Sequence, residues 1–274
     1  MSDYDRDVAS APFGQAMGYA RPVAVDEGLR SYMLRVYNYM ALGLAVTGLA
    51  ALGIYMLSVT GEMAAAAKIV RGGAEIPARI AGNMYLTPLG YYVFVSPIKW
   101  AIMLAPLAIV FVLSFGVQRM RPAAAQLTFW IFAALMGLSL SAIFLVFTHT
   151  SIVRVFFITA ASFGALSLWG YTTQRDLTGL RSFLLMGLFG VILASLVNLF
   201  MASSALQFAV SVAGVLVFAG LTALDTQRLK NEYLEGALDG ETAERAAIVG
   251  ALSLYLNFIN LFTLLLQLLG QREQ

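Results

Sequence analysis

The chain has 274 residues, of which 60% are apolar and only 12% are charged, about half the charged share of a typical soluble domain. Such sparse charge excludes a disordered chain, and the absence of cysteine excludes a disulfide-rich secreted scaffold. A net charge of +2 over this length also argues against nucleic-acid binding. The composition therefore indicates an integral membrane protein.

Long stretches without charge predict the membrane spans. A helix needs about 20 apolar residues to cross the hydrocarbon core. The stretch between Arg181 and Asp225 has 43 uncharged residues, so it is predicted to hold two spans joined by a tight turn at 202–204. Period-2 alternation, the mark of a membrane barrel, is absent, so the spans are helices. The sequence predicts an all-α polytopic membrane protein with seven spans, at 34–57, 99–117, 126–147, 154–172, 183–201, 206–225 and 247–269.

The segments outside the spans set the domain organisation and the orientation. Residues 1–27 lack the apolar run of a signal peptide and are predicted to be a disordered cytoplasmic tail. Residues 28–270 then form one membrane domain with a single long external loop, 58–98, in which a short helix over 62–70 is expected between segments broken by Gly and Pro. With the N-terminus in the cytoplasm, 11 of the 17 basic residues lie inside, so the positive-inside rule predicts a cytoplasmic N-terminus and an external C-terminus.

Asp225 is the one clear acid within the predicted spans, at the cytoplasmic end of the sixth. Ionisable groups inside a membrane are functional candidates, so Asp225 is a candidate cation or proton site. The alternative is an interfacial carboxylate paired with a basic residue such as Arg228 or Arg119. A transient calcium ion at Asp225 is the only metal that we expect, and no cofactor is predicted.

The seventh span carries a second polar group. Ser253, Asn257 and Asn260 lie at i, i+4 and i+7 on one helix face. Amides inside a membrane helix usually form hydrogen bonds with a neighbouring helix, so one interpretation is that these residues hold helices together. The other is that this face lines a pore beside Asp225.

The residue types needed for catalysis are missing. His149 is the only histidine, and it lies about 12 Å along the predicted helix from Ser141, too far for a Ser–His pair. An intramembrane aspartyl protease needs two acids that share a proton, and the spans offer only Asp225. We therefore expect no enzymatic activity.

Five runs of this sequence resemble the Bax inhibitor-1 family. The most specific are the fourth and fifth, and in chain order the runs are GLRSYMLRVYNYM (28–40), FWIFAALMGLSLS (129–141), SLWGYTTQRDL (167–177), GLTALDTQR (220–228) and GALSLYLNFINLF (250–262). The resemblance implies a seven-helix bundle with the last helix at its centre. It further implies a pH-sensitive calcium leak, which in bacterial members lies in the inner membrane.

The resemblance also implies a gate and shows one departure from it. Family members with a pH sensor have two hydrogen-bonded aspartates at the cytoplasmic mouth; Asp225 matches the first, and Asn257 stands at the second. A latching arginine is implied too, and topology suggests Arg119 or Arg121. Two close carboxylates cannot easily both ionise, whereas the Asn257 amide can donate to ionised Asp225. We therefore expect the two-acid pH switch to be absent or shifted to lower pH. In straight helices the two residues meet only if the seventh span begins deeper, or the sixth is longer, than predicted.

Three functions remain open. The first is a passive cation leak with calcium as substrate, in which Asp225 acts with oxygens from Asn257 and Asn260. The second is a proton-coupled transporter, which would need discontinuous helices; Pro106 is the only proline well inside a span. The third is a non-conducting regulator, such as a stress or protease modulator, whose partners are other membrane proteins. The expected partners are thus the lipid bilayer, cations and membrane proteins, without nucleic acid.

Overall fold

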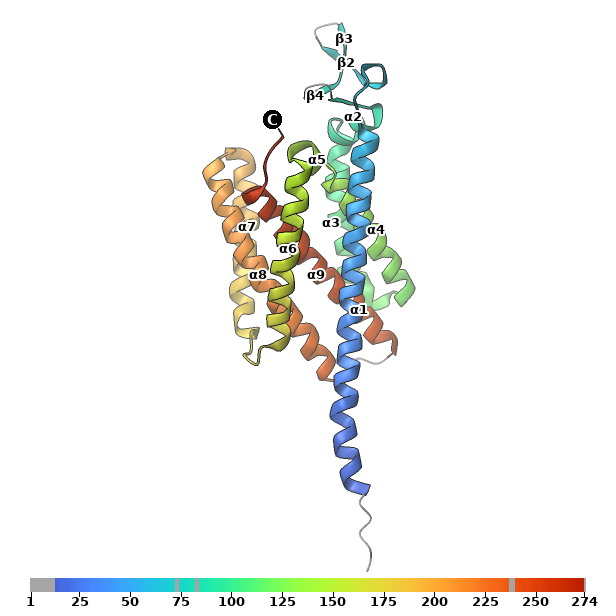
Figure 1. Ribbon diagram of the computed structural model, residues 1–274, viewed down its shortest axis with the longest axis vertical. Helices are drawn as coiled ribbons and strands as arrows, with labels where there is room; N and C mark the ends of the chain where they lie inside the picture. Colours follow the sequence, from blue (N-terminus) through green and yellow to red (C-terminus); the bar gives the residue numbers. More distant parts are fainter. Residues whose placement is uncertain (1–12, 72–73, 82–83, 237–239, 274) are drawn as a thin grey trace, which may run out of the picture.

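The computed structural model describes residues 13–71, 74–81, 84–236 and 240–273, and its architecture is a bundle of long helices (Figure 1). In the described residues, six helices are long and apolar enough to cross a membrane, and a bent pair adds a seventh span. This confirms the predicted all-α polytopic fold. The long helices are α1 (Phe13–Ser58), α3 (Ile98–Gly116), α4 (Pro122–Leu140), α6 (His149–Thr172), α7 (Arg181–Met201), α8 (Ser204–Leu234) and α9 (Gly240–Leu269).

The bent pair consists of α3 and the short helix α2 (Pro88–Phe94), which meet at 61°. A short helix, α5 (Ile143–Val146), follows α4. The chain enters the bundle with α1 at one end and leaves it at the opposite end, as expected for an odd number of crossings (Figure 1). The end that carries the β-strands is called the outer end below, and the opposite end the inner end.

The last helix, α9, is the centre of the bundle. It contacts α1, α4, α6 and α8, and 61% of the residues in its apolar segment are buried, more than in any other span. Tyr255 of α9 is completely buried, and its hydroxyl lies 2.7 Å from Thr47 Oγ1 of α1. Thr47 in turn donates to the carbonyl of Ala133 in α4 over 2.8 Å. One polar chain therefore joins three helices inside the apolar core.

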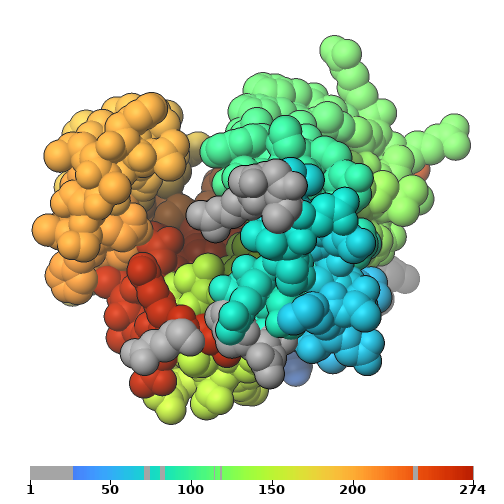
Figure 2. Space-filling view, turned by 90° about the horizontal axis from the view of Figure 1, so that it is seen from above, coloured from blue at the N-terminus to red at the C-terminus, as the bar shows by residue number. Residues whose placement is uncertain are grey.

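Two helices lie at the periphery. The main partner of α7 is α8, and the main helical partner of α3 is α4. Seen from the outer end, a hollow separates α7 from α3 and α4, with the more distant parts of α8 and α9 at its bottom (Figure 2). Neither peripheral helix therefore forms a main contact of the central helix.

The outer segment between α1 and α2 is mostly β-structure, which corrects the expected helix over 62–70. Only Met63–Ala65 is helical, as a 3-10 turn, and β2 (Lys68–Arg71) pairs with β3 (Ala74–Pro77) as an antiparallel hairpin. The β-branched residues of β2 favour a strand, and Ile69 pairs with Ile76. A second sheet has the order β1-β5-β4 and contains β1 (Val59–Thr60), β4 (Arg79–Ala81) and β5 (Met84–Leu86).

The start of α1 also differs from the prediction. The helix begins at Phe13, so residues 13–27 are helical where a disordered tail was expected. Extending an existing helix adds one hydrogen bond for each residue fixed and needs no new nucleus. Residues 1–12 lie outside the described residues, so the predicted disorder there remains a prediction.

The tight turn predicted at 202–204 is confirmed. Ala202 ends α7 in the left-handed conformation with φ 49°, and Ser203 caps α8 by accepting a hydrogen bond from Leu206 N over 3.3 Å. A serine side chain at this position satisfies one of the free N–H groups of the first helical turn. Two residues thus connect two antiparallel spans.

Candidate functional site

Asp225 and Asn257 meet at the contact between α8 and α9. The Asn257 side-chain amide donates to Asp225 Oδ2 over 2.8 Å, the hydrogen bond that the sequence suggested. The condition for this contact is met because α8 does not end at the predicted boundary of 225 but continues to Leu234. Asp225 is thereby placed within the helix, opposite the middle of α9.

Arg228 completes a polar network at this contact. One helical turn beyond Asp225, its Nη2 lies 3.4 Å from Asp225 Oδ1 and donates to Ser253 Oγ of α9 over 3.3 Å. Each carboxylate oxygen therefore has its own partner, and α8 is joined to α9 at two points. The Asp225 side chain is 17% exposed, whereas that of Arg228 is 42% exposed, so the network opens to solvent on the arginine side.

The structure does not bring Arg119 or Arg121 to the carboxylate. Both side chains are exposed at the turn between α3 and α4, and the described ion pair of Asp225 is made with Arg228. Residues three apart on a helix are neighbours, so Arg228 reaches Asp225 without help from another helix. The sequence offers an ion pair with Arg228 or Arg119 as the alternative to a cation site at Asp225, and the structure shows the ion pair with Arg228.

Asn260 lies one turn from Asn257 but does not join the network. Its Nδ2 donates to the carbonyl of Leu256 in its own helix over 2.8 Å. Of the three polar residues predicted on one face of α9, the structure therefore places Ser253 and Asn257 at the Asp225 site and Asn260 outside it.

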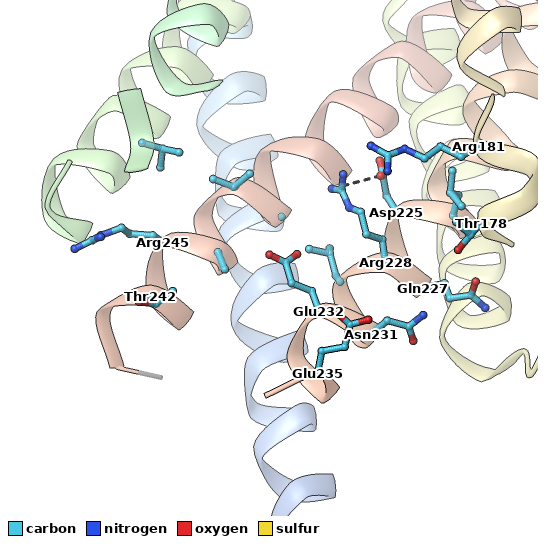
Figure 3. Close-up of a pocket in the computed structure, with 16 residues that line it drawn as sticks. Thr178, Arg181, Asp225, Gln227, Arg228, Asn231, Glu232, Glu235, Thr242 and Arg245 are labelled. Atoms are coloured by element: carbon cyan, nitrogen blue, oxygen red, sulfur yellow. Dashed lines mark ion pairs between the residues drawn. The ribbon is translucent and has the colours of Figure 1, made fainter. Parts of the chain in front are cut away.

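A cavity of about 620 Å³ lies beside the network (Figure 3). Acidic and basic groups are balanced in its lining, and Figure 3 shows Arg181 extending from the start of α7 toward Asp225. The charged lining residues are Asp225, Glu232, Glu235, Arg181, Arg228 and Arg245. Such a cavity can hold water and exchange small ions with the solvent at the inner end.

Several of these residues were missed by sequence reasoning. Glu232 and Glu235 follow Asp225 at i+7 and i+10, on the same face of α8. Because the sixth span was ended at 225, the residues after it were treated as a loop. The helical spacing of the charges at 225, 228, 232 and 235 is the signal that could have extended the helix.

The opposite face of α8 is fixed to α6 and to the segment that follows it. Gln227 donates from Nε2 to the carbonyl of Arg175 over 2.7 Å and accepts at Oε1 from Leu177 N over 2.8 Å. Lys230 Nζ donates to the carbonyl of Tyr171 over 2.8 Å. These contacts make the inner half of α8 a rigid support for the Asp225 side chain.

The donors around Asp225 do not form a closed metal cage. Across the part of the chain that the structure describes, no group of three or more His, Cys, Asp or Glu side chains is arranged to hold a metal ion. A calcium ion usually takes six to eight oxygen ligands. The Asp225 carboxylate, the Asn257 side-chain carbonyl and the Ser253 hydroxyl supply fewer oxygens than such a site.

Comparison with known proteins identifies the family. The family model described as inhibitor of apoptosis-promoting Bax1 matches residues 29–274. An uncharacterized protein of Rickettsia prowazekii, RP147, is 45% identical over 248 residues, which are 90% of this chain and 92% of the relative. An uncharacterized protein of Caulobacter vibrioides is 42% identical over the full length of both chains. Inner membrane protein YbhL of Escherichia coli is 40% identical over 90% of this chain and 94% of its own. The chain therefore belongs to the Bax inhibitor family of membrane proteins.

Proposed function

We propose that this protein is a cation leak of a bacterial inner membrane, with calcium as a permeating ion and Asp225 at its cytoplasmic mouth. The observation that carries the proposal is the position of the Asp225 carboxylate, which lies within a membrane-spanning helix, against the central helix and beside a cavity of about 620 Å³. An ionisable group within a membrane span costs free energy, so its presence there marks a functional candidate.

In this proposal the network around Asp225 is the gate. Its two contacts, Asn257 with Asp225 and Arg228 with Ser253, join α8 to α9 at the inner end. Because α8 is fixed to α6 on its other face, separation of this contact requires α9 to move. Arg228 also neutralises the carboxylate that would attract a cation. Release of Arg228 therefore removes one of the two contacts and exposes the charge of Asp225.

The proposed orientation follows the positive-inside rule. The inner end would face the cytoplasm, with the N-terminus there and the C-terminus outside. The name of the relative YbhL, an inner membrane protein, supports the same membrane for this chain.

The second candidate is a non-conducting regulator that binds other membrane proteins. The observation in its favour is the outer β-structure of residues 59–86, which projects beyond the helix bundle (Figure 1). A polar network at the α8–α9 contact would then serve packing alone. The two candidates differ in whether the purified protein conducts ions.

The test is calcium flux from proteoliposomes that contain the full-length protein. Asp225→Asn keeps the size of the side chain but removes its charge and one of its two acceptor oxygens, and we expect at least a tenfold loss of flux. Asp176→Asn is the matched control, since Asp176 is an exposed acid of the α6–α7 segment whose pKa is lowered by hydrogen bonds from the Thr178 side chain and backbone. Flux no higher than that of empty liposomes for the unaltered protein would contradict the leak and favour the regulator.

A further inference from the structure

Polar side chains follow one face of α9 along half of its length. The spacing of three or four residues places them on one side of the helix, and the set consists of Ser253, Asn257, Asn260, Thr263 and Gln267. We call this set the α9 polar stripe. From the first to the last member the helix rises about 21 Å, which is most of the hydrocarbon thickness of about 30 Å.

The polar stripe coincides with the least covered face of the central helix. Ser253, Asn260 and Thr263 are half-buried and Gln267 is exposed, whereas Leu254 and Tyr255 on the other faces are completely buried. The main neighbours of α9 are α1, α4, α6 and α8, and the hollow between α7 and α3 lies above α8 and α9 (Figure 2). Ser253, Asn257 and Gln267 bond α8. Asn260 and Thr263, between them, have no bonding partner on another helix among the described residues, so these two lie beside the uncovered space.

The hydrogen bonds of the stripe indicate what fills that space. Asn260 Nδ2 donates to the carbonyl of Leu256, and Thr263 Oγ1 donates to the carbonyl of Asn260 over 3.0 Å. Asn260 Oδ1 receives no hydrogen bond from any residue that the structure describes. A carbonyl oxygen against acyl chains without a donor would cost free energy. Water can satisfy it, and an acyl chain cannot.

The outer end of the stripe is closed by a cluster of amides. Gln267 Oε1 accepts from Gln207 Nε2 and, over 3.0 Å, from Ser211 Oγ, both on α8. Asn198 Nδ2 of α7 donates to Gln207 Oε1 over 2.9 Å. Side-chain bonds therefore join α8 to α9 at both ends of the stripe. At the inner end these are the bonds of Asp225 and Arg228, and at the outer end they are the bonds of the uncharged Gln267 side chain.

We propose that the α9 polar stripe lines a water-filled groove between α3 and α7, and that the Gln207–Gln267–Ser211 cluster is its outer constriction. Asn260 and Thr263 then line the groove between the Asp225 network at its inner end and this outer constriction. The outer constriction carries no charge. This proposal deepens the proposed leak, because the groove leads to the Asp225 site. Its test does not depend on ion flux.

The natural absence of cysteine makes the test direct, because each introduced cysteine is the only thiol. Asn260→Cys and Thr263→Cys are exposed in membranes to a membrane-impermeant thiol reagent, which reacts with the thiolate and so needs water at the site. The controls are Leu196→Cys, at an apolar residue of α7 that is 54% exposed, and Leu254→Cys, which is completely buried. We expect both stripe cysteines to react at least tenfold faster than both controls.

Opening of the outer constriction gives a second readout. Gln267→Ala, or separately Gln207→Met, should raise the reaction rate at Thr263→Cys severalfold and leave that at Leu196→Cys unchanged. Stripe cysteines that react as slowly as Leu196→Cys, with and without these changes, would overturn the groove. Reactive cysteines without calcium flux would support the groove and contradict the leak. Calcium flux with unreactive cysteines would support the leak and contradict the groove.

Discussion

The Asn257 amide donates to Asp225 across 2.8 Å, at a position where the sequence resemblance implies a second aspartate. Two carboxylates at that separation would share a proton, because both cannot easily be charged. The Asn257 amide does not titrate near neutral pH, and its N–H group donates a hydrogen bond to the charged carboxylate. The network of Asp225, Arg228, Asn257 and Ser253 therefore contains one negative and one positive group and no pair of like charges.

Replacing Asn257 with aspartate tests this difference. In Asn257→Asp, two carboxylates face each other, so one of them should bind a proton as the pH falls toward neutrality. We expect calcium flux from proteoliposomes to change severalfold between about pH 5 and 8, the range in which a coupled carboxylate titrates. The unaltered protein should show a weaker dependence over that range.

Asn38→Asp is the control for this variant. It adds the same charge at an exposed position of α1, away from Asp225 and from the α9 polar stripe. A flux-pH curve for Asn257→Asp that coincides with those of the unaltered protein and of the control would refute the role of this position.

Removing the charge of Arg228 should open the leak. Arg228→Gln loses the ion pair with Asp225 and weakens the contact with Ser253, so we expect severalfold faster calcium flux. Because Arg228 is partly exposed, added salt should screen the ion pair in the unaltered protein and raise its flux as well. That salt dependence should be lost in Arg228→Gln. Arg119→Gln and Arg121→Gln, at exposed positions, should match the unaltered protein, and equal fluxes in all four proteins would contradict the latch.

The spans could be predicted because the membrane imposes a simple rule on the sequence. A stretch of about 20 uncharged apolar residues has few alternatives to a crossing helix. The end of α8 could not be predicted by this rule, because its last residues leave the bilayer as a charged helix supported by Gln227 and Lys230. For the same reason the sequence leaves the partner of Asp225 open between Arg228 and Arg119, because a span that ends at 225 puts both arginines in loops at the same end.

The outer β-structure illustrates a different limit. Its strands are two to four residues long, and no periodic pattern can develop over such a length. Pairing across the chain, as between Ile69 and Ile76, selects the strands there. The Asp225–Asn257 contact was foreseeable because the resemblance aligned both positions, whereas the contact between Gln207 and Gln267 joins residues 60 apart that no motif connects.

The close approach of α4 to α1 depends on Gly137. A Cβ atom at this position would meet the carbonyl oxygen of Thr47 and the side chain of Ala50 in α1. Gly137→Ala should therefore push the two helices apart and destabilise the protein by about 1–3 kcal/mol, the usual cost of overpacking. Gly164→Ala is the control, because a Cβ at Gly164 meets nothing within 4 Å. Thermal unfolding in detergent should show a lower Tm for the first variant alone, and an unchanged Tm for both would contradict the close contact.

The polar chain through Tyr255 should contribute less than the packing of its ring. Tyr255→Phe removes the hydrogen bond to Thr47, while Thr47 keeps its bond to the Ala133 carbonyl. One hydrogen bond between membrane helices contributes about 0.6 kcal/mol, so Tm should fall only slightly. Tyr255→Ala also removes the edge-to-face contacts with Phe129 and Phe132, and the loss of a buried aromatic ring costs about 3–5 kcal/mol. Unfolding of both variants, with the exposed Tyr92→Phe as control, separates the two contributions. A loss for Tyr255→Phe as large as that for Tyr255→Ala would show that the hydroxyl, and not the ring, holds α9 at the centre of the bundle.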